Sequence, residues 1–274
     1  MILFIHSVNV LLPLIYGVAL GMYAWHFFQN TSKIGEYASR TLLTAIVLHL
    51  VYLVSQGVHF RIFPVATIFA SMSMFALNIS VIYLIIERIS KDRKTGIFFL
   101  IIIFCFQLCS SMLITFESPT NSILSNPMFG IHTTLTLFGV SALAISALYS
   151  IMYLMLAKEI KRHRFGLIYD GLPALETLEN MSRYATGAGI IFLGAGLFTG
   201  HLWSYKVLGY FFKYDVKIIA SDVAWFFYLF GWILVKIRHL HGLKMSRVAI
   251  GGFLAFIIIL FVANFVDTTF HSFI

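Results

Sequence analysis

Histidine is the residue type with the widest chemical scope in this sequence. Ten histidines occur in a chain of 274 residues of which only 11% are charged. A neutral imidazole ligates metal ions, and it gains a proton near physiological pH. His49 lies in the middle of an apolar run, His132 near the start of another, and His271 among the last four residues. A single histidine at a membrane surface usually hydrogen-bonds a carbonyl group, so only their joint placement can indicate a ligand site.

The stretch from Gly200 to Lys217, GHLWSYKVLGYFFKYDVK, gathers flat aromatic rings around a single acid, Asp215. The rings belong to Trp203, Tyr205, Tyr210, Phe211, Phe212 and Tyr214. Aromatic side chains pack well against other flat, apolar groups. The alternative is an aromatic belt, because Trp and Tyr gather at membrane surfaces in many proteins.

The elements that must position these residues are predicted to be membrane-spanning helices. The chain is 60% hydrophobic with a mean hydropathy of +0.92, and soluble domains carry about 25% charged residues. Its apolar runs are continuous and about 20 residues long, which a helix needs to cross roughly 30 Å of hydrocarbon. Strands of a β-barrel would instead alternate in polarity over about ten residues. We therefore predict an all-α integral membrane protein, one transmembrane domain over residues 1–274, with a bundle of about eight transmembrane helices near 8–28, 39–58, 64–86, 96–115, 129–157, 185–204, 219–238 and 248–268.

The distribution of Lys and Arg predicts the orientation of these spans. The connection 87–95, ERISKDRKT, has two Arg and two Lys, whereas the connection 116–128 has no base. Basic residues gather in cytoplasmic loops, so the odd-numbered connections are predicted to be cytoplasmic and both termini outside. The same bias explains the net charge of +8 without nucleic acid as a partner. No signal-peptide cleavage pattern precedes the first span, so we expect Met1 to be retained.

The connection 158–184 is the longest, and it predicts one amphipathic helix on the cytoplasmic membrane surface. Its apolar residues recur every three positions with charges between them, at Leu172, Leu175, Leu178 and Met181. Such a pattern is typical of a helix that lies in the interface.

His132 and His271 fall at the same, outer end of the predicted bundle, beside the aromatic stretch. Bis-histidine ligation of haem iron requires two imidazoles on opposite faces of a flat macrocycle, against which aromatic rings can pack. Zinc is the rival, because imidazole also suits zinc. A zinc site needs a compact tetrahedral set of ligands, and no HxxxH or CxxC spacing supplies one. The pattern favours haem.

A second haem site inside the membrane is a further hypothesis. His49 lies in the second span, and His239 and His241 lie at the inner end of the seventh, in KIRHLHGLK. An ionisable group within a span is a functional candidate by default. His49 would pair with His239 or His241, although the sequence places them at different depths.

The aromatic stretch resembles the external loop of the membrane haem-handling proteins of cytochrome c assembly, the CcsA/ResC type with its HemX-like and YpjD-like relatives. The loop pattern of that family is G-x-x-W-A-x-x-x-W-G-x-Y-W-x-W-D-P-K-E, and five residues match it without a gap: Gly200, Trp203, Gly209, Asp215 and Lys217. Aromatic exchanges stand at Phe211, Phe212 and Tyr214, and the positions of a Trp, the Pro and the Glu hold Leu208, Val216 and Ile218. The segment NPMFGIHTTLTLFG and the ending FHSF put His132 and His271 at the two external histidines of the family.

The resemblance implies a protein of the bacterial cytoplasmic (inner) membrane that binds b-type haem non-covalently and presents it at the external face. His132 and His271 would be the axial ligands, with Trp203, Phe211, Phe212 and Tyr214 as a stacking platform. Asp215 or Lys217 would meet a haem propionate or brace the loop. The implied partners are apocytochrome c, a second membrane subunit of cytochrome c assembly, and membrane lipids.

The altered loop is most like the HemX/YpjD branch, so other functions stay open. At most, the chain would be part of a haem-attachment (synthetase) system. The alternatives are a non-catalytic membrane protein that modulates haem biosynthesis or another membrane complex, and a haem-free transporter or scaffold. Gly194, Gly196 and Gly200 in the sixth span fit either a discontinuous transporter helix or close helix packing.

Overall fold

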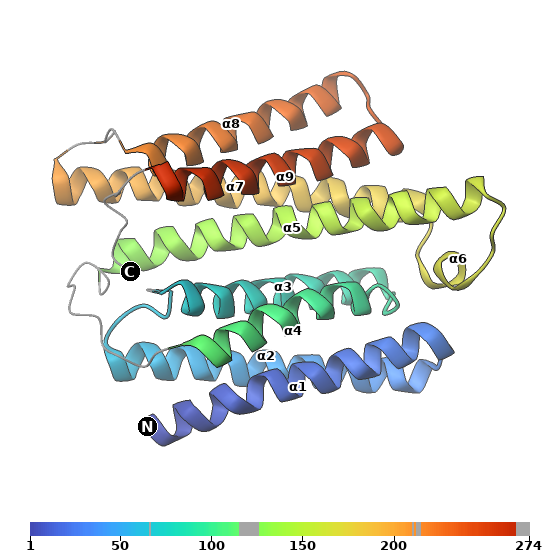
Figure 1. Ribbon diagram of the computed structural model, residues 1–274, viewed down its shortest axis with the longest axis horizontal. Helices are drawn as coiled ribbons and strands as arrows, with labels where there is room; N and C mark the ends of the chain where they lie inside the picture. Colours follow the sequence, from blue (N-terminus) through green and yellow to red (C-terminus); the bar gives the residue numbers. More distant parts are fainter. Residues whose placement is uncertain (66, 115–125, 210, 212–214, 267–274) are drawn as a thin grey trace. The chain divides into compact units, whose positions relative to one another are not determined.

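The computed structural model describes residues 1–65, 67–114, 126–209, 211 and 215–266, and every element among them is a helix (Figure 1). Eight of these helices are long and apolar enough to cross a membrane, which confirms the predicted all-α integral membrane protein. The helices are α1 Ile2–Gln29, α2 Ser32–Phe60, α3 Ile68–Ser90, α4 Gly96–Leu113, α5 Pro127–Lys161, α6 Leu167–Gly171, α7 Leu175–Leu208, α8 Val216–Ile237 and α9 Leu243–Val266.

The chain divides into two compact units. The first comprises residues 1–126 and 165–173, and the second comprises residues 127–164 and 174–274. The single transmembrane domain expected from the sequence stays a prediction beside this division. Helices α1 to α4 and the short α6 belong to the first unit, and α5, α7, α8 and α9 belong to the second.

The first unit is a bundle in which α1 packs on α2 and α4, and α3 packs on the same two helices. Its interior carries polar stripes. Asn9, Tyr16 and Tyr23 lie seven residues apart on α1, and a seven-residue step returns a helix to nearly the same face. Ser73, Ser80 and Glu87 repeat this spacing on α3, and all six residues are buried. Apolar side chains such as Val18 and Ile85 are exposed on the outside, the arrangement expected of a bundle solvated by lipid.

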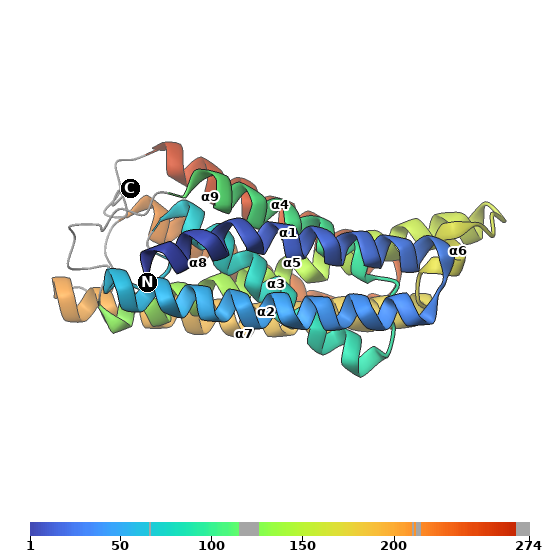
Figure 2. The ribbon, with the colours of Figure 1, turned by 90° about the horizontal axis from the view of Figure 1, so that it is seen from below.

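The second unit is built on the antiparallel pair α5 and α7, which run side by side (Figure 1 and Figure 2). The residue pairs in contact advance in opposite directions along the two helices, from His132 against Gly196 to Ser146 against Thr186. Small residues set the close approach, because small side chains let helix backbones come together in membranes. A buried ladder of hydroxyl groups joins the pair at its other end, formed by Ser146, Ser150, Ser182 and Thr186.

Helix α7 includes the segment that the sequence predicted as a separate surface helix. The segment is helical, but it forms the first turns of α7, which continues without a break to Leu208. Leu178 is 0% exposed and Ser182 hydrogen-bonds Ser150 of α5, so this face packs on protein rather than on the membrane surface. The glycines of α7 do not interrupt it either.

At 1.5 Å per residue, α5 with its 35 residues is roughly 52 Å long, longer than the roughly 30 Å hydrocarbon layer.

Candidate functional site

The predicted ligand His132 lines a cavity of about 230 Å³ in the second unit. Helices α5, α7, α8 and α9 all contribute to its wall. The wall is apolar at Leu197, Val207, Ile218 and Leu260. Its polar residues are His132, Thr136, His201, Trp203, Ser204, Lys217, Ser221 and Asp222. A cavity with apolar walls and a few convergent polar groups is the usual form of a small-molecule site.

The hydrogen bond of His132 determines which of its nitrogens can act as a ligand. Its Nδ1 lies 2.7 Å from the carbonyl oxygen of Gly196 on α7. A carbonyl oxygen can only accept, so Nδ1 carries the proton and Nε2 keeps its lone pair. Nε2 has no hydrogen-bond partner among the residues that the structure describes. Histidines that ligate metals almost always donate their other N–H to a carbonyl or carboxylate in this way.

Gly200 gives the imidazole of His132 room to reach α7. A Cβ atom at Gly200 would lie 2.6 Å from His132 Nδ1, closer than real Cβ contacts. A Cβ at Gly196 would meet the hydroxyl oxygen and the backbone nitrogen of Thr136 in the same way. Two glycines one helical turn apart therefore form the groove in which this part of α5 lies.

His201 sits on the wall of the same cavity, and both of its ring nitrogens are engaged. Nδ1 donates to the carbonyl oxygen of Phe211 at 3.1 Å, and Nε2 lies 3.1 Å from Asp222 Oδ2 on α8. The ring also stacks on Phe211, with centroids 5.5 Å apart. The His201–Asp222 pair therefore joins α7 to α8. Asp222 was not predicted as a site residue from the sequence, although an acid inside an apolar span is a signal for one.

The remaining loop residues of the prediction have distinct positions. Trp203 lines the cavity, is only 5% exposed, and its Nε1–H has no hydrogen-bond partner among the described residues. Asp215 is the N-cap of α8, because its Oδ1 accepts from the backbone N–H groups of Lys217 at 2.9 Å and Ile218 at 3.3 Å. Lys217 is half-buried and lines the cavity.

Three predicted residues, His271, Phe212 and Tyr214, lie outside the described residues. The convergence of His132 and His271 on one macrocycle therefore stays a prediction. Within the described ranges, no group of three or more His, Cys, Asp or Glu side chains is arranged to hold a metal ion.

His49 is the centre of a buried hydrogen-bond chain in the first unit. It is 0% exposed, its Nδ1 lies 3.1 Å from Tyr16 Oη, and its Nε2 lies 2.8 Å from Ser73 Oγ. Ser73 donates onward to Gln107 Oε1 at 3.0 Å, so Ser73 must accept from His49 Nε2–H. Tyr16 then donates to Nδ1. Both nitrogens of His49 are used in this arrangement.

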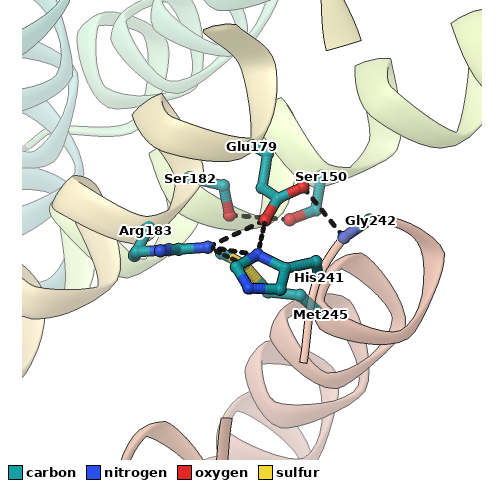
Figure 3. A network of polar contacts seen from close by, with 7 residues as sticks. All are labelled: Ser150, Glu179, Ser182, Arg183, His241, Gly242 and Met245. Atoms are coloured by element: carbon teal, nitrogen blue, oxygen red, sulfur yellow. Dashed lines mark hydrogen bonds and ion pairs between the residues drawn. The ribbon is translucent and has the colours of Figure 1, made fainter. Parts of the chain in front are cut away.

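His239 and His241 lie at the end of α8 in the second unit, and both are exposed. Figure 3 shows His241 beside Glu179 and Arg183 of α7. Its Nδ1 lies 2.9 Å from Glu179 Oε1 and 3.0 Å from Arg183 Nη2. Glu179 also accepts from the backbone N–H of Gly242 at 2.8 Å. His49 belongs to the other unit, so a haem site between His49 and either of these residues stays a prediction.

The chain is similar to known proteins both in sequence and in fold. The model of a family described as Cytochrome C assembly protein matches residues 65–271. Protein HemX of Brevibacillus brevis is 27% identical over 262 residues, 94% of each chain. Inner membrane protein YpjD of Escherichia coli (strain K12) is 25% identical over 78% of this chain and 80% of its own. The solved structure of Cytochrome c Heme Lyase CcmF shares the fold with a TM-score of 0.63 at 17% identity, over 96% of this chain and 49% of that one. This chain thus spans about half the length of that solved structure.

Proposed function

Because the chain belongs to the cytochrome c assembly protein family, we propose that it is a multi-pass membrane protein that binds haem in the cavity of His132 and serves cytochrome c biogenesis. His132 Nε2 is the first axial ligand, and His271 is the second. The haem is b-type and held without a covalent bond. The membrane is the bacterial inner membrane.

The observation that carries this proposal is the distance of 2.7 Å between His132 Nδ1 and the carbonyl oxygen of Gly196. This hydrogen bond fixes the tautomer whose Nε2 can bind iron, and it also fixes the plane of the ring. Such a bond makes the imidazole a better donor to a metal. An imidazole that merely filled space between α5 and α7 would not need to line a cavity.

The other wall residues fit a porphyrin, which is an apolar disc with two carboxylates on one edge. Leu197, Val207 and Leu260 offer apolar contact, and Lys217 offers a cation to a propionate. The indole N–H of Trp203, buried without a partner among the described residues, is a second donor for a carboxylate. A buried donor without an acceptor costs about 1–3 kcal/mol, which a bound carboxylate would recover.

When bound, haem would supply the vinyl groups that receive the cysteine thiols of apocytochrome c. The residues of this chain bind and orient the ring. Asp215 holds the start of α8, and His201, which pairs with Asp222, holds the carbonyl of Phe211, so Phe211 stays against the imidazole of His201 on the cavity wall. Apocytochrome c and a second assembly subunit would bind the protein at the stretch from Gly200 to Lys217.

A second candidate function is haem binding without attachment, in a protein that modulates haem biosynthesis or another membrane complex. The observation in its favour is Ile218, which lines the cavity where the family pattern has a glutamate. An isoleucine side chain can neither transfer a proton nor hydrogen-bond a group that binds a haem propionate. A strain that lacks its cytochrome c synthetase separates the two functions: covalent haem on cytochrome c restored by this chain would reject the second.

The experiment that tests the haem site is an absorption spectrum of the purified protein with added haem. We expect a bis-histidine Soret band in the wild type and its loss in His132→Asn. The asparagine amide can still donate to Gly196, so this variant removes the ligand and keeps the packing. Added imidazole should restore six-coordinate haem in His132→Asn.

His163→Asn is the matched control, because His163 is exposed in the connection between α5 and α6 and its removal should leave the spectrum unchanged. His271→Asn tests the second ligand separately. An unchanged Soret band in His132→Asn would refute the proposed site.

A further inference from the structure

A second cavity of the same unit lies where α7, α8 and α9 meet, near the connection between α8 and α9. Its volume is about 330 Å³, within the range of small-molecule sites. No described residue lines both this cavity and that of His132. Apart from Arg183, Thr186, Tyr228 and Trp232 its lining is apolar.

We call this second cavity the slot, and glycines keep it open. Gly231 of α8 and Gly251 of α9 both line it, and a Cβ atom at either position would meet no atom within 4 Å. Glycine in a helix interior costs about 1 kcal/mol relative to alanine, and here no close helix contact requires it. The unfilled volume therefore comes from residues that could carry side chains without a clash.

One end of the slot is cationic. Arg183 lines it, and the Nε–H of this guanidinium is buried without a hydrogen-bond partner among the described residues. The neighbouring segment 236–247 contains two Lys and two Arg and no acid. The ammonium of Lys236 lies 5.4 Å from the ring centroid of Trp232. Glu179 is the acid that faces this end, and it is already bonded to Arg183 Nη2 and the Gly242 N–H.

We propose that this slot binds one anionic phospholipid from the surrounding bilayer. An acyl chain lies along Gly231 and Gly251, and the phosphate accepts from Arg183 Nε and meets the basic segment 236–247. Basic pockets between transmembrane helices on the cytoplasmic side bind anionic headgroups, and positive residues predict this end to be cytoplasmic. Gly251 is exposed on the surface of its unit, so a chain can enter sideways from the membrane.

Native mass spectrometry of the detergent-purified protein tests the site, with phosphatidylglycerol and phosphatidylcholine of the same chain length as probes. We expect one phosphatidylglycerol to be retained at least 10-fold more strongly than phosphatidylcholine. Gly251→Leu should fill the slot and lower that retention at least 10-fold, and Gly231→Leu should do the same independently. Arg183→Gln should keep lipid binding and bring the preference for the anionic lipid close to one.

Gly21→Leu is the matched control. Gly21 is an exposed glycine of α1 at which a Cβ also meets no atom within 4 Å, so the same change should leave retention at the wild-type level. Equal retention in Gly251→Leu and wild type would overturn the proposal. So would retention of glycerol phosphate, which lacks an acyl chain, as strongly as phosphatidylglycerol, or retention of a porphyrin mass in place of a lipid. None of these outcomes depends on haem at His132, so the two proposals fail separately.

Discussion

Adding one methyl group at Gly200 should displace the imidazole that we assign to haem. The alanine Cβ would lie 2.6 Å from His132 Nδ1 and 2.7 Å from Cε1. Neither α5 nor α7 can move away easily at this point, because Thr136 fills the groove at Gly196 one turn along. The ring must therefore turn, and the bond to the Gly196 carbonyl is lost.

The cost follows from three contributions. Forcing a methyl group into a packed contact costs about 1–3 kcal/mol, and the lost hydrogen bond costs about 0.5–1.5 kcal/mol. Alanine regains about 1 kcal/mol of helix propensity. Gly187→Ala on the same helix has the propensity gain alone, because a Cβ there meets no atom within 4 Å. The two variants should thus differ by about 1.5–4.5 kcal/mol in the free energy of unfolding.

Unfolding in mixed micelles of a mild detergent and dodecyl sulfate, followed by helical circular dichroism, measures this difference. Haem titration on the same samples measures the ligand, and losing the partner of a ligating histidine typically weakens metal affinity by 10–100-fold. Gly187→Ala should keep wild-type haem affinity. If Gly200→Ala were as stable as Gly187→Ala and bound haem equally well, the assigned contact between α5 and α7 would be wrong.

Substitutions at three other positions, Asp215, His49 and Asp92, test the supporting structure by the same unfolding measurement. Asp215→Ala should cost about 0.5–2 kcal/mol through the lost N-cap, and Asp215→Asn should cost less; equal stability of all three proteins would contradict the cap. His49→Phe should destabilise the first unit by about 2–6 kcal/mol, because Tyr16 and Ser73 each lose a buried partner at about 1–3 kcal/mol. A change below about 1 kcal/mol would contradict the buried hydrogen bonds of His49. Burial raises the pKa of the Asp92 carboxyl, so the native state holds that proton more tightly than the unfolded state. The stability that this carboxyl contributes is therefore greatest below about pH 4 and is lost as the pH rises through the raised pKa. In Asp92→Asn this pH-dependent loss of stability should be absent. Parallel plots of unfolding free energy against pH for the wild type and Asp92→Asn would contradict the raised pKa.

The sequence predicted the spanning helices well because the signal for a span is additive. Each apolar residue in a run of about 20 contributes to the transfer of the helix into the bilayer, so single exceptions such as His49 do not hide it. Helix ends were predicted less well where polar residues have protein partners. Ser182 lies just before the predicted span, but it hydrogen-bonds Ser146 and Ser150 of α5. Helix α7 begins at Leu175, ten residues before the predicted span.

The site was only partly predictable for a related reason. His132 was predicted from its residue type, its place at the outer end of a span and the family resemblance, whereas the pairing of His201 with Asp222 of α8 is visible only in the structure. Pairings between helices depend on rotation about each helix axis, and an uncertainty of two residues in register turns a side chain by about 200°. The polar stripes of α1 and α3 escaped notice similarly, because their seven-residue period is visible only once the inward face is known.

The glycines of α7 show how packing can decide ligand chemistry. From the sequence they were compatible with a broken transporter helix or with close packing, and α7 is continuous through all of them. At Gly196 and Gly200 the absence of side chains brings a backbone carbonyl within 2.7 Å of an imidazole. That carbonyl also accepts from Thr199 Oγ1 at 2.8 Å, and its position is fixed by the helix. The hydrogen bond holds the proton on Nδ1 and leaves Nε2 as the only nitrogen able to donate a lone pair. The same two small residues therefore join α5 to α7 and select the tautomer on which the proposed haem ligation depends.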